Sequence, residues 1–285
     1  MSVEIDVAEN LAHALELLSA ADPEVRPVAG ATDMILRLHG GRVKARRLVS
    51  IADVPELSYV LPEAEHIRFG AGTPLSDLMA HPEFAREYPC AMESLRQFAS
   101  PQIRNRATVG GNIGNASPAA DMVPPLIALG TTATLTSRTG ARTLPLEDVF
   151  LGPGRTVLRP DELVTGLSVP RRQGHFQAFA KFGSRGANVI AVVNMALCLQ
   201  LDGDRIASAR VAYGSVAPRT LRPVGLEQFL QGKRLSEELA HEVEAVVRSQ
   251  ISPIDDVRGS RRHKERLAVN ATQDALVRAL TQVRA

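Results

Sequence analysis

The spacing of hydrophobic residues changes several times along the chain, between the 3.6-residue period of helices and the short apolar runs of strands. Leu11, Leu15 and Leu18 share one helical face, and the first strand after them ends in the turn Gly30-Ala31-Thr32-Asp33. The first 57 residues therefore predict a small β/α unit. Its expected elements are a helix over Glu9–Ala20, a strand over 26–29, a helix over Met34–His39 and a strand over Leu48–Ile51.

The chain from residue 58 to residue 172 mixes the same two periods. We expect a strand over 66–72, a short helix from Leu75, a helix over Glu93–Ala99, a hairpin with strands near 133–136 and 143–146, and a strand over Leu163–Val169. Pro170 closes the last strand, because it has no N–H to donate to a neighbour.

The pattern changes after residues 171–174. Residues 195–201 alternate between large apolar and smaller or polar side chains, as in a half-buried strand, and Asp202-Gly203 is typical of a tight hairpin before a strand over Ile206–Tyr213. Two amphipathic helices follow. We expect an α+β fold: a two-subdomain α/β domain over 1–172 (subdomains about 1–57 and 58–172), then a C-terminal domain over 173–285 with a three-stranded antiparallel sheet and helices.

The composition is that of an ordinary globular protein, with 285 residues of which 45% are hydrophobic and 22% are charged. The 33 basic and 31 acidic side chains give a net charge of +2, which offers no electrostatic basis for binding nucleic acid or an anionic membrane. The longest apolar run, Val189–Leu201, contains Asn194 and Gln200 and is too short to cross a bilayer. We therefore expect neither nucleic acid nor a membrane as a partner.

Only two cysteines occur, Cys90 and Cys198, and they lie far apart and outside any C-x-x-C spacing. They cannot by themselves hold an iron–sulfur cluster or zinc, and their apolar neighbours are typical of reduced thiols in a core. The seven histidines show no ligand spacing, so we expect no metal site. The first residues, Met1–Asp6, lack the basic and apolar regions of a signal peptide. These features favour a cytoplasmic location.

Residues 98–130 are dense in glycine, asparagine and serine between two apolar, helix-like segments. Gly110, Gly111 and Gly114 permit turns and a close approach of the backbone to a bulky ligand, and polar side chains occur at short intervals between them. We interpret this stretch as a loop wrapped around a phosphate-bearing cofactor. The earlier turn at Gly30 lacks both the G-x-G-x-x-G of a Rossmann fold and the G-K-[ST] of a P-loop.

The segment Thr108–Asp121, TVGGNIGNASPAAD, resembles the T-[IV]-G-G-N-[IL]-x-x-A-S-P-x-x-D motif of FAD-binding medium subunits in molybdenum hydroxylases, the family of xanthine dehydrogenase and carbon monoxide dehydrogenase flavoproteins. The turn at 28–33 is similar to that family's first flavin loop, A-G-G-T-D-L, and residues 99–105 and 160–164 also fit. The resemblance covers nearly the whole chain. It implies an FAD-binding domain of two α/β subdomains with FAD in the cleft between them, followed by a C-terminal flavoprotein domain.

Carried over by position, the resemblance implies three groups of cofactor-binding residues. One group would wrap the pyrophosphate, Asp121 would hold sugar or ribityl hydroxyls, and a third group would border the flavin end. The pyrophosphate group is Ala29, Gly30, Ala31, Thr32, Asp33 and Met34 with Thr108, Val109, Gly110, Gly111 and Asn112. The flavin-end group is Phe98, Val164 and Lys181, and Ser117 lies in the same motif as Asp121.

Elementary chemistry agrees with these roles. A diphosphate needs many donors in a small volume, and backbone N–H groups at Gly30, Gly110 and Gly111 are expected to supply them. Asp121 is a poor neighbour for a phosphate but a good acceptor for hydroxyls, and Lys181 near the flavin would stabilise an anionic reduced ring. Ser117 and Asp121 also fit helix N-caps, a role that does not exclude the binding role.

Two positions depart from the family pattern. Ala31 stands where the first flavin loop has its second glycine, so we expect a looser backbone approach there. Val189 stands where many relatives carry an acidic residue, which puts any polar role of that position in doubt.

The resemblance implies an electron-transferring flavoprotein subunit of a heterotrimeric molybdenum hydroxylase. Its partners would be a large molybdenum-cofactor subunit and a small iron–sulfur subunit, with NAD or another molecule as electron acceptor and no catalytic residue required in this chain. A self-sufficient flavin oxidase or reductase with a related FAD domain is one alternative, and a nucleotide-binding or scaffolding module without turnover is another. Neighbouring reading frames that encode a large molybdenum subunit and a cysteine-rich small subunit would favour the molybdenum hydroxylase hypothesis.

Overall fold

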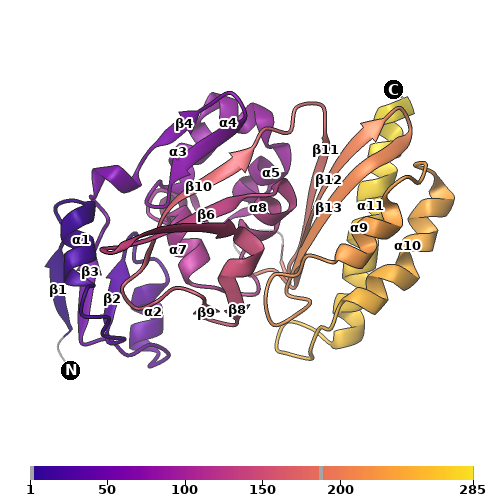
Figure 1. Cartoon of the computed structure of the whole chain (residues 1–285). Coiled ribbons are helices and arrows are strands. Elements are labelled where there is room, and N and C mark those ends of the chain that lie inside the picture. The colour runs from indigo at the N-terminus through magenta and orange to yellow at the C-terminus, as the bar shows by residue number, and fades with distance from the viewer. Residues whose placement is uncertain (1–2, 186–188, 285) are drawn as a thin grey trace.

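Three sheets, one in each part of the chain, organise residues 3–185 and 189–284, which are the residues that the computed structural model describes (Figure 1). The three parts lie in a row, with the N-terminal part at one end and the long last helix at the other. A two-stranded ribbon accompanies the middle part.

The N-terminal part is a β/α unit around a parallel sheet with the strand order β1-β3-β2. Its elements are β1 (Glu4–Val7), α1 (Leu11–Leu17), β2 (Val25–Val28), α2 (Met34–His39) and β3 (Arg47–Ser50). Asn10 is the N-cap of α1, and its side chain accepts a hydrogen bond from the N–H of His13. The two helices and the two strands expected here are confirmed, and the strand β1 was not expected.

The middle part holds a five-stranded antiparallel sheet in the order β4-β5-β10-β6-β7. Its strands are β4 (Val60–Pro62), β5 (His66–Gly70), β6 (Thr132–Ser137), β7 (Gly140–Pro145) and β10 (Leu163–Pro170). Its α-helices are α3 (Leu75–Ala80), α4 (Pro82–Glu87), α5 (Pro89–Gln97), α6 (Pro101–Arg104), α7 (Val109–Gly114) and α8 (Val123–Leu129). The shorter elements are the 3-10 helices η1 (Pro55–Leu57) and η2 (Leu146–Val149) and the ribbon of β8 (Phe150–Gly152) and β9 (Arg155–Thr156). Strands β6 and β7 confirm the expected hairpin.

The C-terminal part is a three-stranded antiparallel sheet with helices packed on one face. Its elements are β11 (Phe176–Phe182), β12 (Val193–Asp202), β13 (Arg205–Gly214), α9 (Val224–Leu230), α10 (Glu237–Gln250) and α11 (Arg261–Arg284). The Asp202-Gly203 hairpin is confirmed, and Gly203 takes the positive φ of 59° that such a turn requires. The expected α+β fold class is therefore confirmed.

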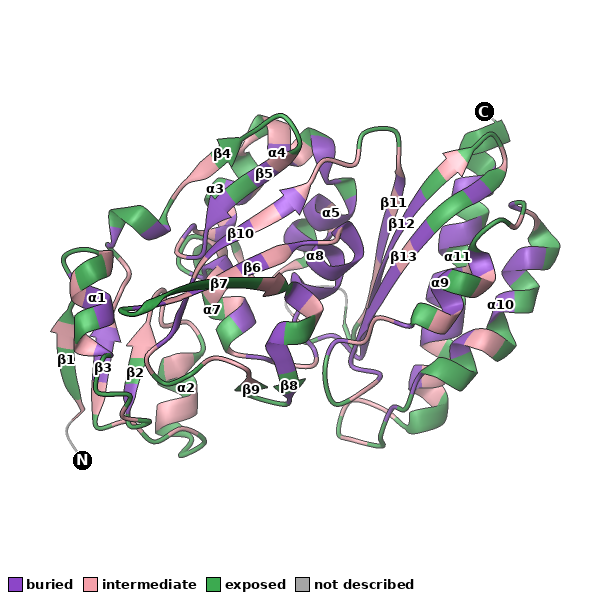
Figure 2. Cartoon of the chain, in the orientation of Figure 1, coloured by how far each residue is buried: buried purple, intermediate pink, exposed green. Residues whose placement is uncertain are grey.

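Helices α5 and α8 lie between the middle sheet and the C-terminal sheet, where Figure 2 shows a continuous buried layer. All residues of α8 are buried. One face of the C-terminal sheet adds Phe179, Ala196, Cys198 and Ala212 to the core around these helices, whereas its other face packs against α9, α10 and α11. The C-terminal part is therefore joined to the middle part by a shared hydrophobic core.

The stretch 98–130 was interpreted as a loop, and this is wrong where the chain forms the helices α6 and α7; its apolar end, already considered as a helix, forms α8. The side chain of Ser100 accepts a hydrogen bond from the N–H of Ile103 at the start of α6, and Thr108 begins α7 in the same way. Only the segments between these short helices are irregular.

Ser117 and Asp121 do not cap a helix, which corrects the second role considered for them. Helix α8 begins after Met122, and the Met122 side chain makes no capping hydrogen bond. Pro124 and Pro125 lie in the first turn and have no N–H, so the helix start has fewer donors to satisfy.

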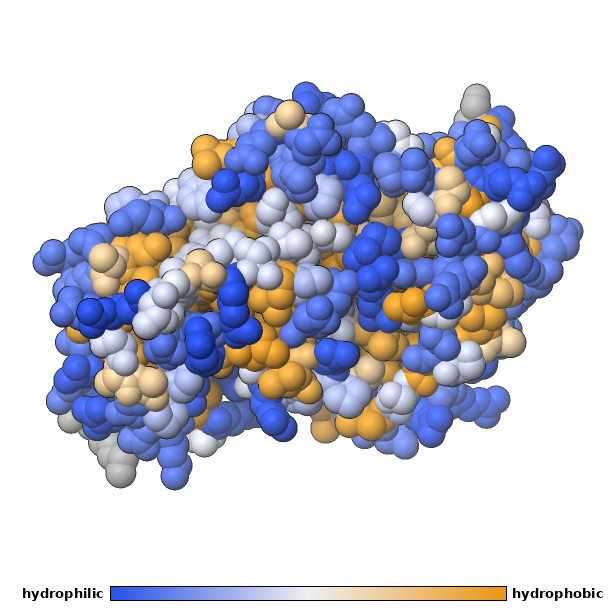
Figure 3. Space-filling view, viewed as in Figure 1, coloured by the Kyte–Doolittle hydropathy of each residue, from blue (hydrophilic) through white to orange (hydrophobic). Residues whose placement is uncertain are grey.

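The molecular face shown in Figure 3 is mostly hydrophilic, with apolar side chains in separate patches. Within residues 3–185 and 189–284, no helix combines the length and the hydropathy needed to cross a membrane.

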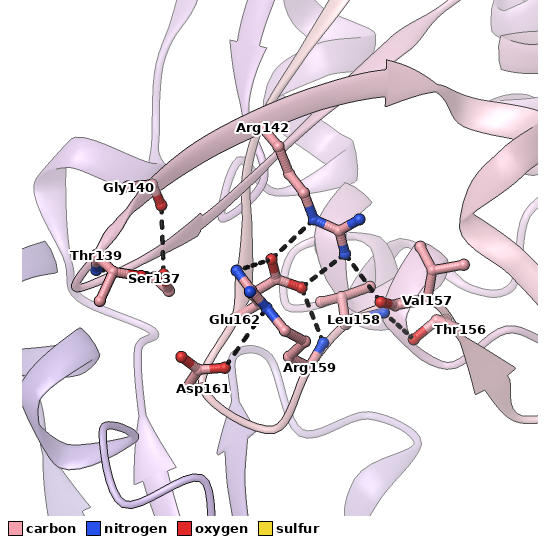
Figure 4. A network of polar contacts seen from close by, with 10 residues as sticks. All are labelled: Ser137, Thr139, Gly140, Arg142, Thr156, Val157, Leu158, Arg159, Asp161 and Glu162. Carbon is pink, nitrogen blue, oxygen red and sulfur yellow. Dashed lines mark hydrogen bonds and ion pairs between the residues drawn. The ribbon is translucent and has the colours of Figure 1, made fainter.

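A buried carboxylate fixes the segment that enters β10 (Figure 4). The Glu162 side chain is 1% exposed and accepts hydrogen bonds of 2.9 Å from Nε and Nη2 of Arg142 and of 2.8 Å from the backbone N–H of Arg159. Burial alone would raise the pKa of Glu162, but these hydrogen bonds outweigh burial and lower the pKa to about 2. Glu162 is therefore ionised and ties β7 to the start of β10.

Glu162→Gln should lower the free energy of unfolding at pH 7 by about 2 kcal/mol, since it removes the charged partner of two arginines that are themselves half exposed. Because the folded pKa lies below the ordinary carboxyl value, the stabilisation is complete above about pH 4.5 and is lost as the pH falls towards 2. Urea unfolding of both proteins at pH 7 and pH 3 measures this. An equal difference at the two pH values would contradict the account.

Candidate cofactor-binding site

The two glycine-containing turns singled out in the sequence touch each other. Gly30 follows β2, and a Cβ atom built on it would lie 1.6 Å from the carbonyl oxygen of Arg106 and 2.4 Å from its carbonyl carbon. Ala107 in turn accepts a hydrogen bond of 2.9 Å from the N–H of Leu75, which anchors it to the middle part. Only glycine permits this approach of two backbones, so Gly30 joins the N-terminal part to the start of α7.

The first turn offers a run of backbone donors. Within the part of the chain that the structure describes, no group accepts a hydrogen bond from the N–H groups of residues 30–34, which lead into α2. The side chain of Asp33 does not cap α2 either. A cluster of N–H groups without partners next to a backbone junction suits an anion with several oxygens, such as a diphosphate.

Three alanines around the two turns have positive φ angles, which alanine rarely adopts. The φ angles are 60° at Ala31, 39° at Ala99 and 45° at Ala116. Such backbone conformations cost about 1–2 kcal/mol each and concentrate at functional sites. The expectation of a looser backbone at Ala31 is thereby refined: the alanine takes the conformation that the family's glycine is suited to.

The second turn differs from the expectation, because its donors are already used. The N–H of Val109 donates to the carbonyl of Thr73, and the N–H of Gly110 donates to the carbonyl of Ala71 at 2.7 Å. The N–H of Gly111 donates to Oγ1 of Thr108 at 3.0 Å. The N–H groups of Gly110 and Gly111 therefore bond within the protein in this structure, whereas those of the first turn are available. A donor role of the two glycines towards a phosphate stays a prediction.

Gly110 and Gly111 have different surroundings. A Cβ atom on Gly110 would lie 2.7 Å from the Cβ of Ala71, so this glycine lets α7 pack closely against the end of β5. Gly111 is exposed, and a Cβ atom on it would meet only Oγ1 of Thr108. The open surface of α7 thus lies at Gly111.

A second contact joins the two turns through side chains. Arg37 on α2 donates a hydrogen bond to Oδ1 of Asn115, directly after α7. On α7 itself, Oδ1 of Asn112 is buried and has no partner among the residues that the structure describes. Arg37, which also lies 3.9 Å from Oδ2 of Asp33, therefore places a positive charge between the two walls of the candidate cleft.

The remaining predicted residues lie further along the chain. Phe98 ends α5 half-buried against the central core, and Val164 on β10 is buried in that core. Oγ of Ser117 accepts a hydrogen bond of 3.3 Å from the N–H of Ala119, within a turn before Asp121. Their contacts with a cofactor stay predictions.

Asp121 and Lys181, predicted separately, form an ion pair between the middle part and the C-terminal part. Nζ of Lys181 lies 2.6 Å from Oδ2 of Asp121 and 3.0 Å from the carbonyl oxygen of Gln97, just before Phe98. The two side chains are 10% and 4% exposed. The pKa of Asp121 is raised, because burial outweighs the Lys181 ammonium and the hydrogen bond from Asn194, which both lower it.

Asn194 is a site residue that the sequence reasoning missed. It lies fully buried in β12, and its Nδ2 donates hydrogen bonds of 3.0 Å to Oδ1 of Asp121 and 3.2 Å to the carbonyl oxygen of Ala120. The sequence does mark this residue, because Asn194 interrupts an otherwise apolar run. A single polar residue inside a buried strand needs a hydrogen-bonding partner.

Comparison with known proteins now gives the family. Residues 2–172 match the family model for the FAD-binding domain in molybdopterin dehydrogenase, which covers more than half of the chain. The chain belongs to this family. Residues 177–279 match the model for the CO dehydrogenase flavoprotein C-terminal domain.

Two curated relatives align with this chain over most of their length. The chain is 33% identical to the glyceraldehyde dehydrogenase medium chain of Sulfolobus acidocaldarius, over 89% of either chain. It is 29% identical to the putative xanthine dehydrogenase FAD-binding subunit of Escherichia coli, over 96% of this chain and 94% of the relative. Both of these relatives are named as subunits or chains of dehydrogenases.

Solved structures agree in fold along the whole chain. A chain of carbon monoxide dehydrogenase from Hydrogenophaga pseudoflava superposes with a TM-score of 0.93 at 27% identity, covering 97% of this chain and 96% of that chain. Quinoline 2-oxidoreductase from Pseudomonas putida 86 gives the same TM-score at 26% identity, covering 100% and 99%. The protein is an FAD-binding medium subunit of the molybdenum hydroxylase family, and FAD is its cofactor.

The residues present fit this cofactor. The unpartnered N–H groups of the first turn suit the diphosphate, and the buried acceptor Asn112 Oδ1 suits a donor group of the ligand. At the other end of the stretch, the Asp121 carboxylate is an acceptor whose charge is balanced by Lys181. The free backbone donors thus lie at the first turn, and the charge-balanced carboxylate lies at the other end of the stretch, as a molecule with a charged diphosphate and neutral hydroxyl groups requires.

Gly30→Ala should lower the free energy of unfolding by about 3 kcal/mol and reduce the flavin content, since the added methyl group meets rigid backbone at Arg106. Gly114→Ala is the matched control: a Cβ atom there meets nothing within 4 Å, and this change should leave stability equal or higher by about 0.5 kcal/mol. Thermal unfolding and the flavin absorbance of purified protein measure both effects. Equal behaviour of the two variants would refute the contact.

Proposed function

We propose that this chain passes electrons from iron–sulfur clusters on a small partner subunit, through its FAD, to NAD or another acceptor. The complex would also contain a large subunit that carries the molybdenum cofactor and oxidises the substrate. Support comes from the relatives, which are named as medium chains or FAD-binding subunits of dehydrogenases. A structural relative is named as a carbon monoxide dehydrogenase that lacks one moiety of a molybdenum cofactor.

The cysteine content supports a division of labour between subunits. The chain holds two cysteines, Cys90 and Cys198, and both are buried and unpaired. Burial raises the pKa of each thiol, which disfavours the thiolate that a cluster needs. A cluster with four cysteine ligands cannot be built from them, so iron–sulfur clusters would belong to a partner. Unpaired thiols also support our proposal of a cytoplasmic location.

The observation that carries the proposed binding mode is the contact between the two turns. We propose that the diphosphate lies against the N–H groups of residues 30–34 and the exposed surface at Gly111, with Arg37 nearby. Asp121 would accept hydrogen bonds from sugar or ribityl hydroxyls. Bound FAD supplies the electron exchange, whereas the protein supplies binding, orientation and charge.

The flavin end would lie towards the C-terminal part. Phe98 ends α5 next to Gln97, whose carbonyl oxygen is bonded to Lys181, so these residues approach one region from two parts of the chain. We propose Phe98, Val164 and Lys181 as its border. We also propose two domains, 1–172 with subdomains about 1–57 and 58–172, and 173–285, so that the flavin end faces the domain boundary.

A self-sufficient flavin oxidase or reductase is the competing function. Such an enzyme needs its own substrate pocket with a catalytic acid or base. Among the described residues, four titratable groups approach the candidate cleft, and all are engaged in ion pairs or hydrogen bonds: Asp121 with Lys181, and Arg37 with Asn115 and, at 3.9 Å, with Asp33. This arrangement favours a subunit that binds a cofactor over an enzyme that carries out its own proton transfers.

Purification of the chain from its native host tests the proposal. We expect a yellow, iron-containing complex with one larger and one smaller partner, in which a substrate of the complex bleaches the flavin absorbance only when both partners are present. The isolated chain with added FAD is the control and should show no substrate-dependent bleaching. A chain that elutes alone and turns over a substrate would establish the competing function.

A further inference from the structure

Three residues form one row across the C-terminal sheet. Lys181 on β11 is paired with Asn194 on β12, and Asn194 is paired with Gly214 on β13. The row lies against the segment Ser117–Asp121 of the family motif, where Lys181 and Asn194 each bind one oxygen of the Asp121 carboxylate. The adjacent Ser215, with a φ of 65°, donates its N–H to the carbonyl of Pro118 at 2.7 Å. The C-terminal sheet therefore holds this segment at several points.

The residues around Asn194 leave space for its amide group. Asn194 is 0% exposed, and a Cβ atom on Gly214 would lie 2.0 Å from its Oδ1, so the glycine leaves the space that the amide occupies. Burying an amide is unfavourable unless it forms hydrogen bonds. Both hydrogen bonds of Nδ2 go to the same short segment, to Ala120 and Asp121. Oδ1 of Asn194 has no hydrogen-bond partner among the described residues, so every hydrogen bond of this amide acts on that segment.

Two fixed oxygens leave the Asp121 carboxylate one orientation. An ionised carboxylate has about four acceptor sites, and Lys181 and Asn194 each use one of them. The remaining sites have a defined direction, because neither oxygen can rotate without losing a charge-assisted hydrogen bond. Lys181 also balances the negative charge of the carboxylate. Asn194 fixes the orientation of the carboxylate without changing the net charge.

We propose that Asn194 is a positioning residue for the cofactor, which holds Oδ1 of Asp121 so that the carboxylate meets the hydroxyl groups of FAD. This inference rests on the proposed role of Asp121 in the cleft. Asn194 touches no ligand itself, since it is completely enclosed by β12, β13 and the segment Ala120–Asp121. The flavin site is thereby completed by a residue of the C-terminal part.

A double-mutant cycle on the full chain, freed of flavin and titrated with FAD, tests the inference. Asn194→Ala should raise the Kd of FAD about tenfold, since it removes a hydrogen bond to a charged group. Asp121→Ala should raise Kd by at least as much. Adding Asn194→Ala to Asp121→Ala should then change Kd less than about twofold, because the group through which Asn194 acts has been removed.

Two further variants separate positioning from packing. Asn194→Asp keeps the shape but replaces the donor with a like charge beside Asp121, so it should also weaken FAD binding. Thr272→Val is the matched control, since Thr272 is a fully buried polar residue of the same domain whose hydroxyl bonds Tyr213 and Ala268 and no residue of the motif. It should leave Kd unchanged even where thermal unfolding shows a loss of stability.

The outcomes are distinguishable. Suppose that Asp121→Ala weakens FAD binding, and that Asn194→Ala raises Kd by the same factor in the wild type and in the Asp121→Ala variant. The positioning role is then overturned, and the role of Asp121 stands. If Asp121→Ala binds FAD like the wild type, the proposed role of Asp121 is overturned together with the inference. Wild-type affinity of Asn194→Ala or of Asn194→Asp overturns the inference alone.

Discussion

The backbone of Gly30 lies against the carbonyl of Arg106, and no side chain fits between them. This contact sets the distance between the β2–α2 turn and the start of α7, since Ala107 is hydrogen-bonded to α3 and Gly110 to the end of β5. The candidate cleft therefore has one wall built on the middle sheet and a second wall that meets it at this backbone junction and through Arg37. The N-terminal part also shares a small hydrophobic core with Leu57 and Leu163, and a ligand that spans both walls adds a further connection.

The two ends of the site differ in chemistry in a way that the cofactor explains. Backbone N–H groups without partners gather at residues 30–34, where a negative diphosphate is stabilised by donors. A carboxylate lies at the other end, where neutral hydroxyl groups need acceptors. The charge of Asp121 is matched by Lys181, so the acceptor is present without an unbalanced buried charge. This separation keeps the carboxylate away from the phosphates and makes one elongated ligand fit in one direction.

Local sequence was enough to predict the longer strands, the Asp202-Gly203 hairpin and the long C-terminal helices, because their periods and turn residues act over a few positions. It did not predict the short strands β1, β4, β8 and β9. It was not enough for α7, whose glycines disfavour a helix. This helix forms because Thr108 caps it and because its first N–H groups bond to Ala71 and Thr73, which are contacts between distant segments. The bonds that the N–H groups of Gly110 and Gly111 make within the protein could not be predicted for the same reason.

The residues of the motif were found from the sequence, but their partners were not. The pairing of Asp121 with Lys181 and Asn194 depends on the register of β11 and β12, which brings those two residues opposite each other. The need for glycine at position 30 likewise comes from Arg106, a residue in another part of the fold. Long-range register and backbone packing are therefore what the sequence left undetermined.

Amide hydrogen exchange with and without FAD tests the central claim most directly, namely that the turn at residues 30–34 supplies the donors for the diphosphate. Peptides that contain these amides should exchange markedly more slowly once FAD is bound, whereas the amides of Val109 and Gly110, already bonded to carbonyl groups, should change little. Unchanged exchange at residues 30–34 in a chain that demonstrably holds FAD would contradict the account.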